Sequence, residues 1–211
     1  MIRIVLVRPG STDYDDQGRI QGSLSIPLNS GGVDEVQRMV PQLKNLGTEA
    51  VYCPDCDPAL QTATMLAAAL DVKLKKLEGM CNLNHGLWQG KLIDEVKRQQ
   101  PKVYRQWSEQ PDSVCPPEGE TVGDVRERAG AAVAKLMRKH KQGTIALVLP
   151  EPVASIVRSI LGHGELGDLW HACEEHGRSE VIELDAAAAD HSGVWRGVVV
   201  EAHAHPADGK A

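Results

Sequence analysis

The sequence has 211 residues, of which 42% are hydrophobic and 25% charged, the ordinary composition of a globular α/β protein. The net charge of −6, with no basic cluster to offset it, argues against a nucleic-acid partner. No apolar run approaches the ~20 residues that span a bilayer, so we expect no membrane association. The five cysteines are an odd number without framework spacing and indicate reduced thiols. Because the N-terminus also lacks a signal-peptide pattern, we expect a cytoplasmic protein.

The chain opens with an apolar run, Ile2 to Val7, that stops at Arg8-Pro9-Gly10. Such a run predicts a buried strand that empties into a loop. The periodicity that follows predicts a helix over residues 32–46, a buried strand over 49–52, an Ala- and Leu-rich helix over 59–70, and a weak edge strand over 73–77.

The second half continues this alternation after a loop over residues 78–90. The pattern predicts a helix over 91–107 that Pro101 must kink or split, a surface loop over 112–121, a helix over 122–140, a strand over 144–149, a helix over 152–161, and strands over 179–184 and 194–200. We expect residues 201–211 to form a polar, mobile tail. The alternation predicts a single α/β domain over residues 1–200, with three layers and a mostly parallel sheet covered by helices on both faces.

Several short motifs occur in a characteristic order. The first loop, Arg8-Pro9-Gly10-Ser11-Thr12, precedes Gly18-Arg19-Ile20-Gln21-Gly22. The later motifs are Pro58-Ala59-Leu60-Gln61-Thr62-Ala63, Asn82-Leu83-Asn84-His85-Gly86-Leu87-Trp88-Gln89-Gly90, Pro117-Glu118-Gly119-Glu120-Thr121 with Asp124-Val125 and Arg128, and Leu149-Pro150-Glu151-Pro152. In combination, over roughly residues 2 to 185, they resemble the signatures of the histidine phosphatase (phosphoglycerate-mutase-like) superfamily. The resemblance implies a phosphoglycerate-mutase-like fold.

The resemblance also implies a reaction, from which four positions depart. In the family a neutral imidazole attacks phosphorus, a second imidazole and two guanidinium groups neutralise the phosphate oxygens, and a carboxylic acid protonates the leaving alcohol. Here the corresponding positions hold Pro9, Pro58, Asn82 and Pro150, with Pro150 or the adjacent Glu151 in the place of the second histidine. Proline offers no nucleophile or donor, and asparagine transfers no proton at neutral pH. We therefore expect a catalytically degenerate member with a binding or scaffolding role.

Six residues of these motifs are candidates for contact with a ligand: Arg8, Thr12, Arg19, Gln21, Gly22 and His85. Arg8, the one retained charged group, either binds a ligand or pairs with a nearby acid such as Glu120 or Glu151. The nearby loops carry six acids against the two arginines, which predicts a weak field for a phosphate dianion. These acids are Asp13, Asp15, Asp16, Asp55, Asp57 and Glu151.

Two other functions stay open. One is a weak phosphomonoesterase or phosphoglycerate-mutase-like enzyme that uses a displaced residue such as His85. The other is a metal or redox protein that uses the C-x-x-C pair Cys53 and Cys56, with Cys81 and His85 on a loop predicted to converge there. We expect no cofactor. The partner would be an unidentified small molecule or protein, and a homo-oligomer is also open.

Overall fold

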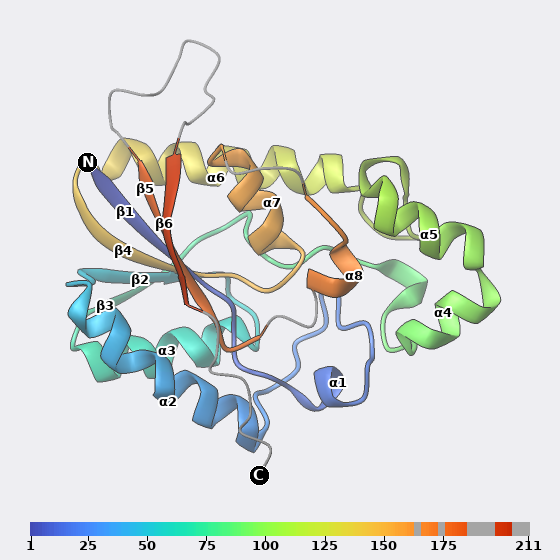
Figure 1. The fold of residues 1–211 in the computed structure, drawn as a ribbon, viewed down its shortest axis with the longest axis horizontal. Coiled ribbons are helices and arrows are strands. Elements are labelled where there is room, and N and C mark those ends of the chain that lie inside the picture. The colour runs from blue at the N-terminus through green and yellow to red at the C-terminus, as the bar shows by residue number, and fades with distance from the viewer. Residues whose placement is uncertain (163–165, 173–175, 185–196, 204–211) are drawn as a thin grey trace.

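The computed structural model describes residues 1–162, 166–172, 176–184 and 197–203, the last of these by backbone alone. Figure 1 shows strands and helices alternating along the chain. The strands are β1 (Ile2–Val7), β2 (Ala50–Cys53), β3 (Lys73–Lys76), β4 (Gly143–Val148), β5 (Ser179–Leu184) and β6 (Gly197–His203). The helices are α1 (Asp13–Asp16), α2 (Ser30–Asn45), α3 (Ala59–Leu70), α4 (Ile93–Gln99), α5 (Pro101–Glu109), α6 (Val122–Lys139), α7 (Val153–Ile160) and α8 (Leu169–Ala172), with 3₁₀ turns η1 (Gly86–Trp88) and η2 (Pro111–Ser113).

The six strands form one mixed sheet in the order β3-β2-β4-β1-β5-β6. The four strands from β3 to β1 pair in parallel, whereas β5 runs antiparallel to both β1 and β6. The register of β1 against β4 runs from Ile2 opposite Gly143 to Val7 opposite Val148, so the two strands end side by side. The predicted α/β class with a mostly parallel sheet is confirmed.

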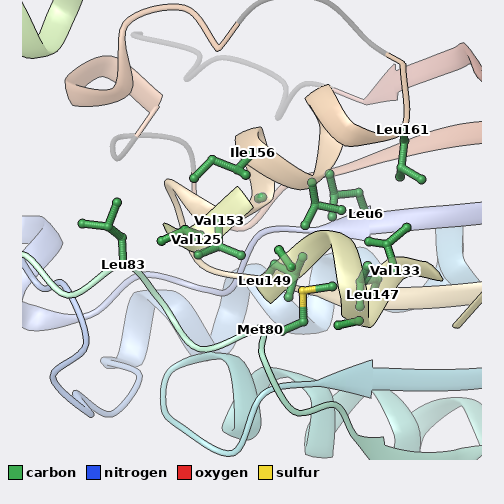
Figure 2. Packing of buried hydrophobic residues seen from close by; sticks show 14 of the residues in the cluster. Leu6, Met80, Leu83, Val125, Val133, Leu147, Leu149, Val153, Ile156 and Leu161 are labelled. Atoms are coloured by element: carbon green, nitrogen blue, oxygen red, sulfur yellow. The ribbon is translucent and has the colours of Figure 1, made fainter. Parts of the chain in front are cut away.

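Helices cover both faces of the sheet, because successive side chains of a strand point to opposite faces. Ile4 and Leu6 of β1 belong to the core cluster that also contains buried residues of α6 and α7, whereas Val5 and Val7 belong to the cluster with residues of α2 and α3. Figure 1 shows α2 and α3 on one side of the sheet and α6 and α7 on the other. The first cluster, shown in Figure 2, extends onto the loop after β3 through Met80 and Leu83.

Local sequence signals explain several helix boundaries. Asn29 caps α2 by accepting a hydrogen bond from the Gly32 amide, and Thr121 caps α6 in a capping box with Asp124. The predicted helix over 91–107 is two helices, because Pro101 occupies the first turn of α5, where its missing N–H has no cost.

Besides small shifts of element ends, the end of β6 and the presence of α1 differ from the predictions. Strand β6 runs to His203, so residues 201–203 belong to the sheet and not to the predicted tail. The rest of that tail, residues 204–211, lies outside the described residues. Helix α1 was not predicted, because four residues are too short to show a period. Its signal is the capping box that Thr12 forms with Asp15.

Candidate active-site cavity

A cavity of about 290 Å³ lies at the carboxyl ends of β1 and β4, where ligands bind in open α/β sheets. Its lining comes from the loops after β1, β2, β3 and β4 and from the segments around α4, α8 and β5. All four positions predicted to replace the catalytic residues line this one cavity: Pro9, Pro58, Asn82 and Pro150. Glu151, the alternative to Pro150, lines it as well.

Backbone contacts fix Pro9 at the cavity. The carbonyl oxygen of Pro9 accepts a hydrogen bond of 2.7 Å from the Gly177 amide, and the Gly10 amide donates to Thr62 Oγ1 at 3.2 Å. Gly10 itself lies so close to the backbone of Gly32 in α2 that a Cβ atom would collide with it. The first loop is therefore pressed against α2 and α3, and a glycine is required there.

Asn82 is buried and held at the opposite wall. Its Nδ2 donates to the Gly22 carbonyl oxygen at 3.0 Å. Arg128 of α6 fastens the same loop, because its guanidinium donates to the carbonyl oxygens of Gly79, Cys81 and Asn82. Glu120 accepts two further hydrogen bonds from Arg128, at 3.1 and 3.0 Å. The fold therefore holds the Asn82 side chain in place, although an amide cannot transfer a proton as a carboxylic acid does.

Arg8 forms a buried ion-pair network. Its Nε donates to Glu151 Oε1 at 2.7 Å and its Nη1 to Glu180 Oε1 at 3.1 Å. Arg158 of α7 adds a second cation, with its Nε 3.3 Å from Glu180 Oε2. Burial raises the pKa of Glu151, against the lowering effect of the Arg8 charge. The pairing of Arg8 with Glu151 was one of the two predicted alternatives; Glu120 instead pairs with Arg128.

Four other candidate residues occupy different positions around the cavity. Arg19, Gln21 and Gly22 line it, whereas Thr12 is fully buried as the cap of α1. Gln21 Nε2 donates to the carbonyl oxygens of Leu24 and Asp57, so it ties two loops together.

His85 also lines the cavity and is 3% exposed. Burial lowers the pKa of its imidazole to about 4, which keeps the ring neutral at physiological pH. Its Nδ1 lies 3.2 Å from the Leu83 carbonyl oxygen. Since a carbonyl only accepts, Nδ1 carries the proton in the neutral ring and Nε2 carries the lone pair.

The sequence did not predict His176 and Trp170 as site residues, yet both line the cavity. His176 Nδ1 lies 3.0 Å from Glu35 Oε1 of α2, and this hydrogen bond raises the pKa of the imidazole. Glu35 Oε2 accepts from the Ser11 amide at 2.9 Å. The indole N–H of Trp170 donates to the Tyr104 carbonyl oxygen. The contacts of His176 with Glu35 and of Trp170 with Tyr104 join residues 141 and 66 positions apart, so no local pattern indicates them.

The C-x-x-C pair, Cys53 and Cys56, is not among the described residues that line the cavity. Burial raises the pKa of the Cys53 thiol to about 11 and that of Cys56 to about 12, with Cys81 adding to the second shift. The redox interpretation requires a lowered thiol pKa, and these shifts run the opposite way. Within the described ranges, no group of three or more Cys, His, Asp or Glu residues could hold a metal ion.

The lining combines a few titratable side chains with apolar surface. Among the described lining residues, the side chains that can exchange a proton are Asp15, His85, Glu151 and His176, and none is a cysteine, serine or lysine. Trp170 and the three prolines add apolar surface. Such a mixture of apolar walls and a few polar groups is typical of small-molecule sites.

The fold and the cavity define an α/β protein with a ligand-sized site at the carboxyl ends of its parallel strands, and comparisons with known proteins identify the family. Residues 4–192 match the Histidine phosphatase superfamily (branch 1). The chain belongs to this superfamily.

Two curated relatives and two solved structures illustrate the similarity. Phosphoserine phosphatase 1 of Hydrogenobacter thermophilus is 24% identical over 186 residues, 88% of each chain. Phosphoglycerate mutase-like protein 4 of Arabidopsis thaliana is 32% identical over 152 residues, 69% of this chain and 64% of the relative. The mycobacterial glucosyl-3-phosphoglycerate phosphatase superposes with a TM-score of 0.81 at 20% identity (94% and 97% covered), and Bacillus stearothermophilus YhfR with 0.77 at 23% (95% and 96%). At these identities the structures establish the fold alone.

Across the described residues, no helix is long and apolar enough to cross a membrane.

Proposed function

We propose that this protein is a catalytically degenerate histidine phosphatase that binds a small molecule in the cavity without transferring a phosphoryl group. The observation that carries the proposal is the convergence of Pro9, Pro58, Asn82 and Pro150 on one cavity. These positions correspond to the nucleophile, a phosphate-binding arginine, the acid and the second histidine of the family, and none of the four side chains can perform its role.

The surrounding charges support the same proposal. Of the five groups that the family reaction uses, Arg8 alone is retained. Its positive charge is already neutralised by ion pairs with Glu151 and Glu180. A phosphate dianion depends on several cations that face it together. Loss of a nucleophile alone costs on the order of 10⁶-fold in other covalent enzymes. We therefore expect the protein to hydrolyse phosphate esters no faster than the uncatalysed background.

The test is turnover of p-nitrophenyl phosphate at high enzyme concentration, over acidic to neutral pH. The proposal expects no turnover above the background of a mock purification. Turnover that persists through repurification and disappears with a substitution in the cavity would overturn it, as would a phosphohistidine on the protein.

A second candidate is a weak phosphomonoesterase that uses His85, and one observation favours it. His85 lines the same cavity with a neutral imidazole whose Nε2 carries the lone pair. This candidate requires turnover that is lost in His85→Ala. The control is His140→Ala, which changes a histidine at the C-terminal end of α6 and should keep the turnover.

The site, partner and location predictions remain part of the proposal. The partner is a small molecule or a protein. Light scattering of the purified protein would measure whether it forms a homo-oligomer. A cytoplasmic location is supported by the free thiols at Cys53, Cys56, Cys81 and Cys115. The metal or redox alternative would be supported by stoichiometric zinc in protein purified without a His tag.

A further inference from the structure

Arg19 is a positioned cation at the cavity wall. Its backbone is fixed by a hydrogen bond of 2.8 Å from its amide to the Tyr14 carbonyl oxygen. Its Nε donates to Gln17 Oε1 at 2.8 Å and its Nη1 to the Gly90 carbonyl oxygen at 2.6 Å. Both acceptors are neutral, so they orient the guanidinium without cancelling its charge. The Nη2 group adds two further donors to the same planar fork.

The other charged side chains of the lining have partners within the protein. Glu151 pairs with Arg8, and His176 pairs with Glu35. Asp15 Oδ2 accepts from both the amide and the hydroxyl group of Thr12. Among the described residues, no carboxylate lies within ion-pair distance of Arg19. Among the described lining residues, Arg19 is therefore the cation without a carboxylate partner, and Asp15, whose partners are neutral, is the carboxylate without a cationic one.

We infer that the cavity binds a small, singly charged organic carboxylate, with the carboxylate on Arg19 and the apolar part of the ligand against Trp170 and the proline walls. This inference rests on the proposed function, because an active phosphatase would bind the phosphate of its substrate at the position that Pro9 occupies here. A guanidinium fork matches the two oxygens of a carboxylate.

The number of available cations selects the carboxylate over a phosphate ester. A phosphate monoester carries close to two charges at neutral pH and would meet one unbalanced guanidinium, together with the carboxylates of Asp15 and Glu151. A singly charged carboxylate needs only Arg19 and is repelled less by Asp15 and Glu151 than a dianion is. The volume of about 290 Å³ lies at the lower end of small-molecule sites, which favours a ligand of modest size.

Three probes that share a phenyl ring test this assignment: benzoate, phenyl phosphate and benzyl alcohol. Binding to the full chain is measured by isothermal titration calorimetry and by saturation-transfer NMR. We expect benzoate to bind more tightly than both other probes. Arg19→Gln should weaken benzoate binding roughly 10- to 100-fold, the range for loss of a charged hydrogen bond, and should leave benzyl alcohol unaffected.

Arg98→Gln is the matched control, because it removes the same charge from an exposed position on the nearby helix α4. Arg19→Lys keeps the charge, and it should retain part of the affinity even if Arg19→Gln loosens the contact with Gly90. Thermal unfolding of each variant establishes that it is folded.

Equal benzoate binding by Arg19→Gln and the natural protein would overturn the inference. So would failure of benzoate to bind, or tighter binding of phenyl phosphate. These outcomes are distinct from failure of the proposed function, which is measured by phosphate turnover and not by carboxylate binding.

Discussion

Arg8 and Glu151 form a buried ion pair of 2.7 Å between Nε and Oε1, with side chains only 7% and 4% exposed. Arg8 follows β1 and Glu151 follows β4, two parallel neighbours that end at the same edge of the sheet. The pair therefore joins the loops that carry Pro9 and Pro150. It neutralises the charge on Arg8 that the family resemblance would assign to phosphate.

Breaking this pair should destabilise the protein strongly. Glu151→Gln leaves the buried Arg8 with one carboxylate fewer, and removal of one partner from a buried pair costs about 3–5 kcal/mol. Chemical denaturation measures the loss. Glu183→Gln is the matched control, because it breaks the Arg3–Glu183 pair, whose side chains are 48% and 25% exposed. That change should cost less than about 1 kcal/mol. Equal losses would show that burial of the Arg8 pair has no energetic consequence.

The pair between His176 and Glu35 should make stability depend on pH. The Glu35 hydrogen bond raises the pKa of His176 above its ordinary value of 6.5, so its contribution is complete below that value and is lost as pH rises through the raised pKa. Burial opposes the lowering of the Glu35 pKa, but hydrogen bonds from His176 and Ser11 prevail, so the contribution of Glu35 is present above 4.5 and is lost as pH falls through the lowered value.

Comparison of the natural protein with His176→Asn at about pH 5.5 and about pH 8.5 isolates this effect, because His is the residue that titrates in this range. The free energy of unfolding of the natural protein should exceed that of His176→Asn by more at the lower pH than at the higher pH. His140→Asn should show the opposite trend, since burial, followed by the Lys75 charge, lowers the pKa of His140. A stability difference between the natural protein and His176→Asn that stays constant with pH would contradict a contribution from the His176–Glu35 ion pair.

The described cysteines should differ in reactivity. Cys81 and Cys115 are exposed, whereas Cys53 is buried with its pKa raised to about 11. Because the thiolate is the reactive form, iodoacetamide at neutral pH should label Cys81 and Cys115 well before Cys53. Mass spectrometry of digested protein gives the order, and denatured protein provides the fully labelled control. Rapid labelling of Cys53 in folded protein would instead favour the redox alternative.

Much of the fold could be predicted from local pattern. Strand β1 and helix α3 begin and end where the apolar runs do, and Pro101 divides α4 from α5 as a helix-breaking residue must. Several other elements begin or end one to three residues from their predicted bounds. In α2 the cause is capping, because Asn29 starts the helix at Ser30, ahead of the first periodic residue.

The candidate site was predictable only in part. The motif order indicated Pro9, Pro58, Asn82 and Pro150, and the fold places all four at one cavity. The contacts of Arg8 with Glu180 and of His176 with Glu35 join residues 172 and 141 positions apart. Such pairs depend on the strand order and on the packing of α2, which no local period encodes. That Arg19 lines the cavity without a carboxylate partner therefore became apparent only from the structure.

Turnover of p-nitrophenyl phosphate by the natural chain, compared with the revertant Pro9→His, Pro58→Arg, Asn82→Glu and Pro150→His, tests the central claim most directly. The degenerate-site account predicts no turnover by the natural protein, and turnover gained by the revertant would show that the scaffold still supports the family reaction. Turnover by the natural protein that is abolished by a substitution in its own cavity would contradict the account.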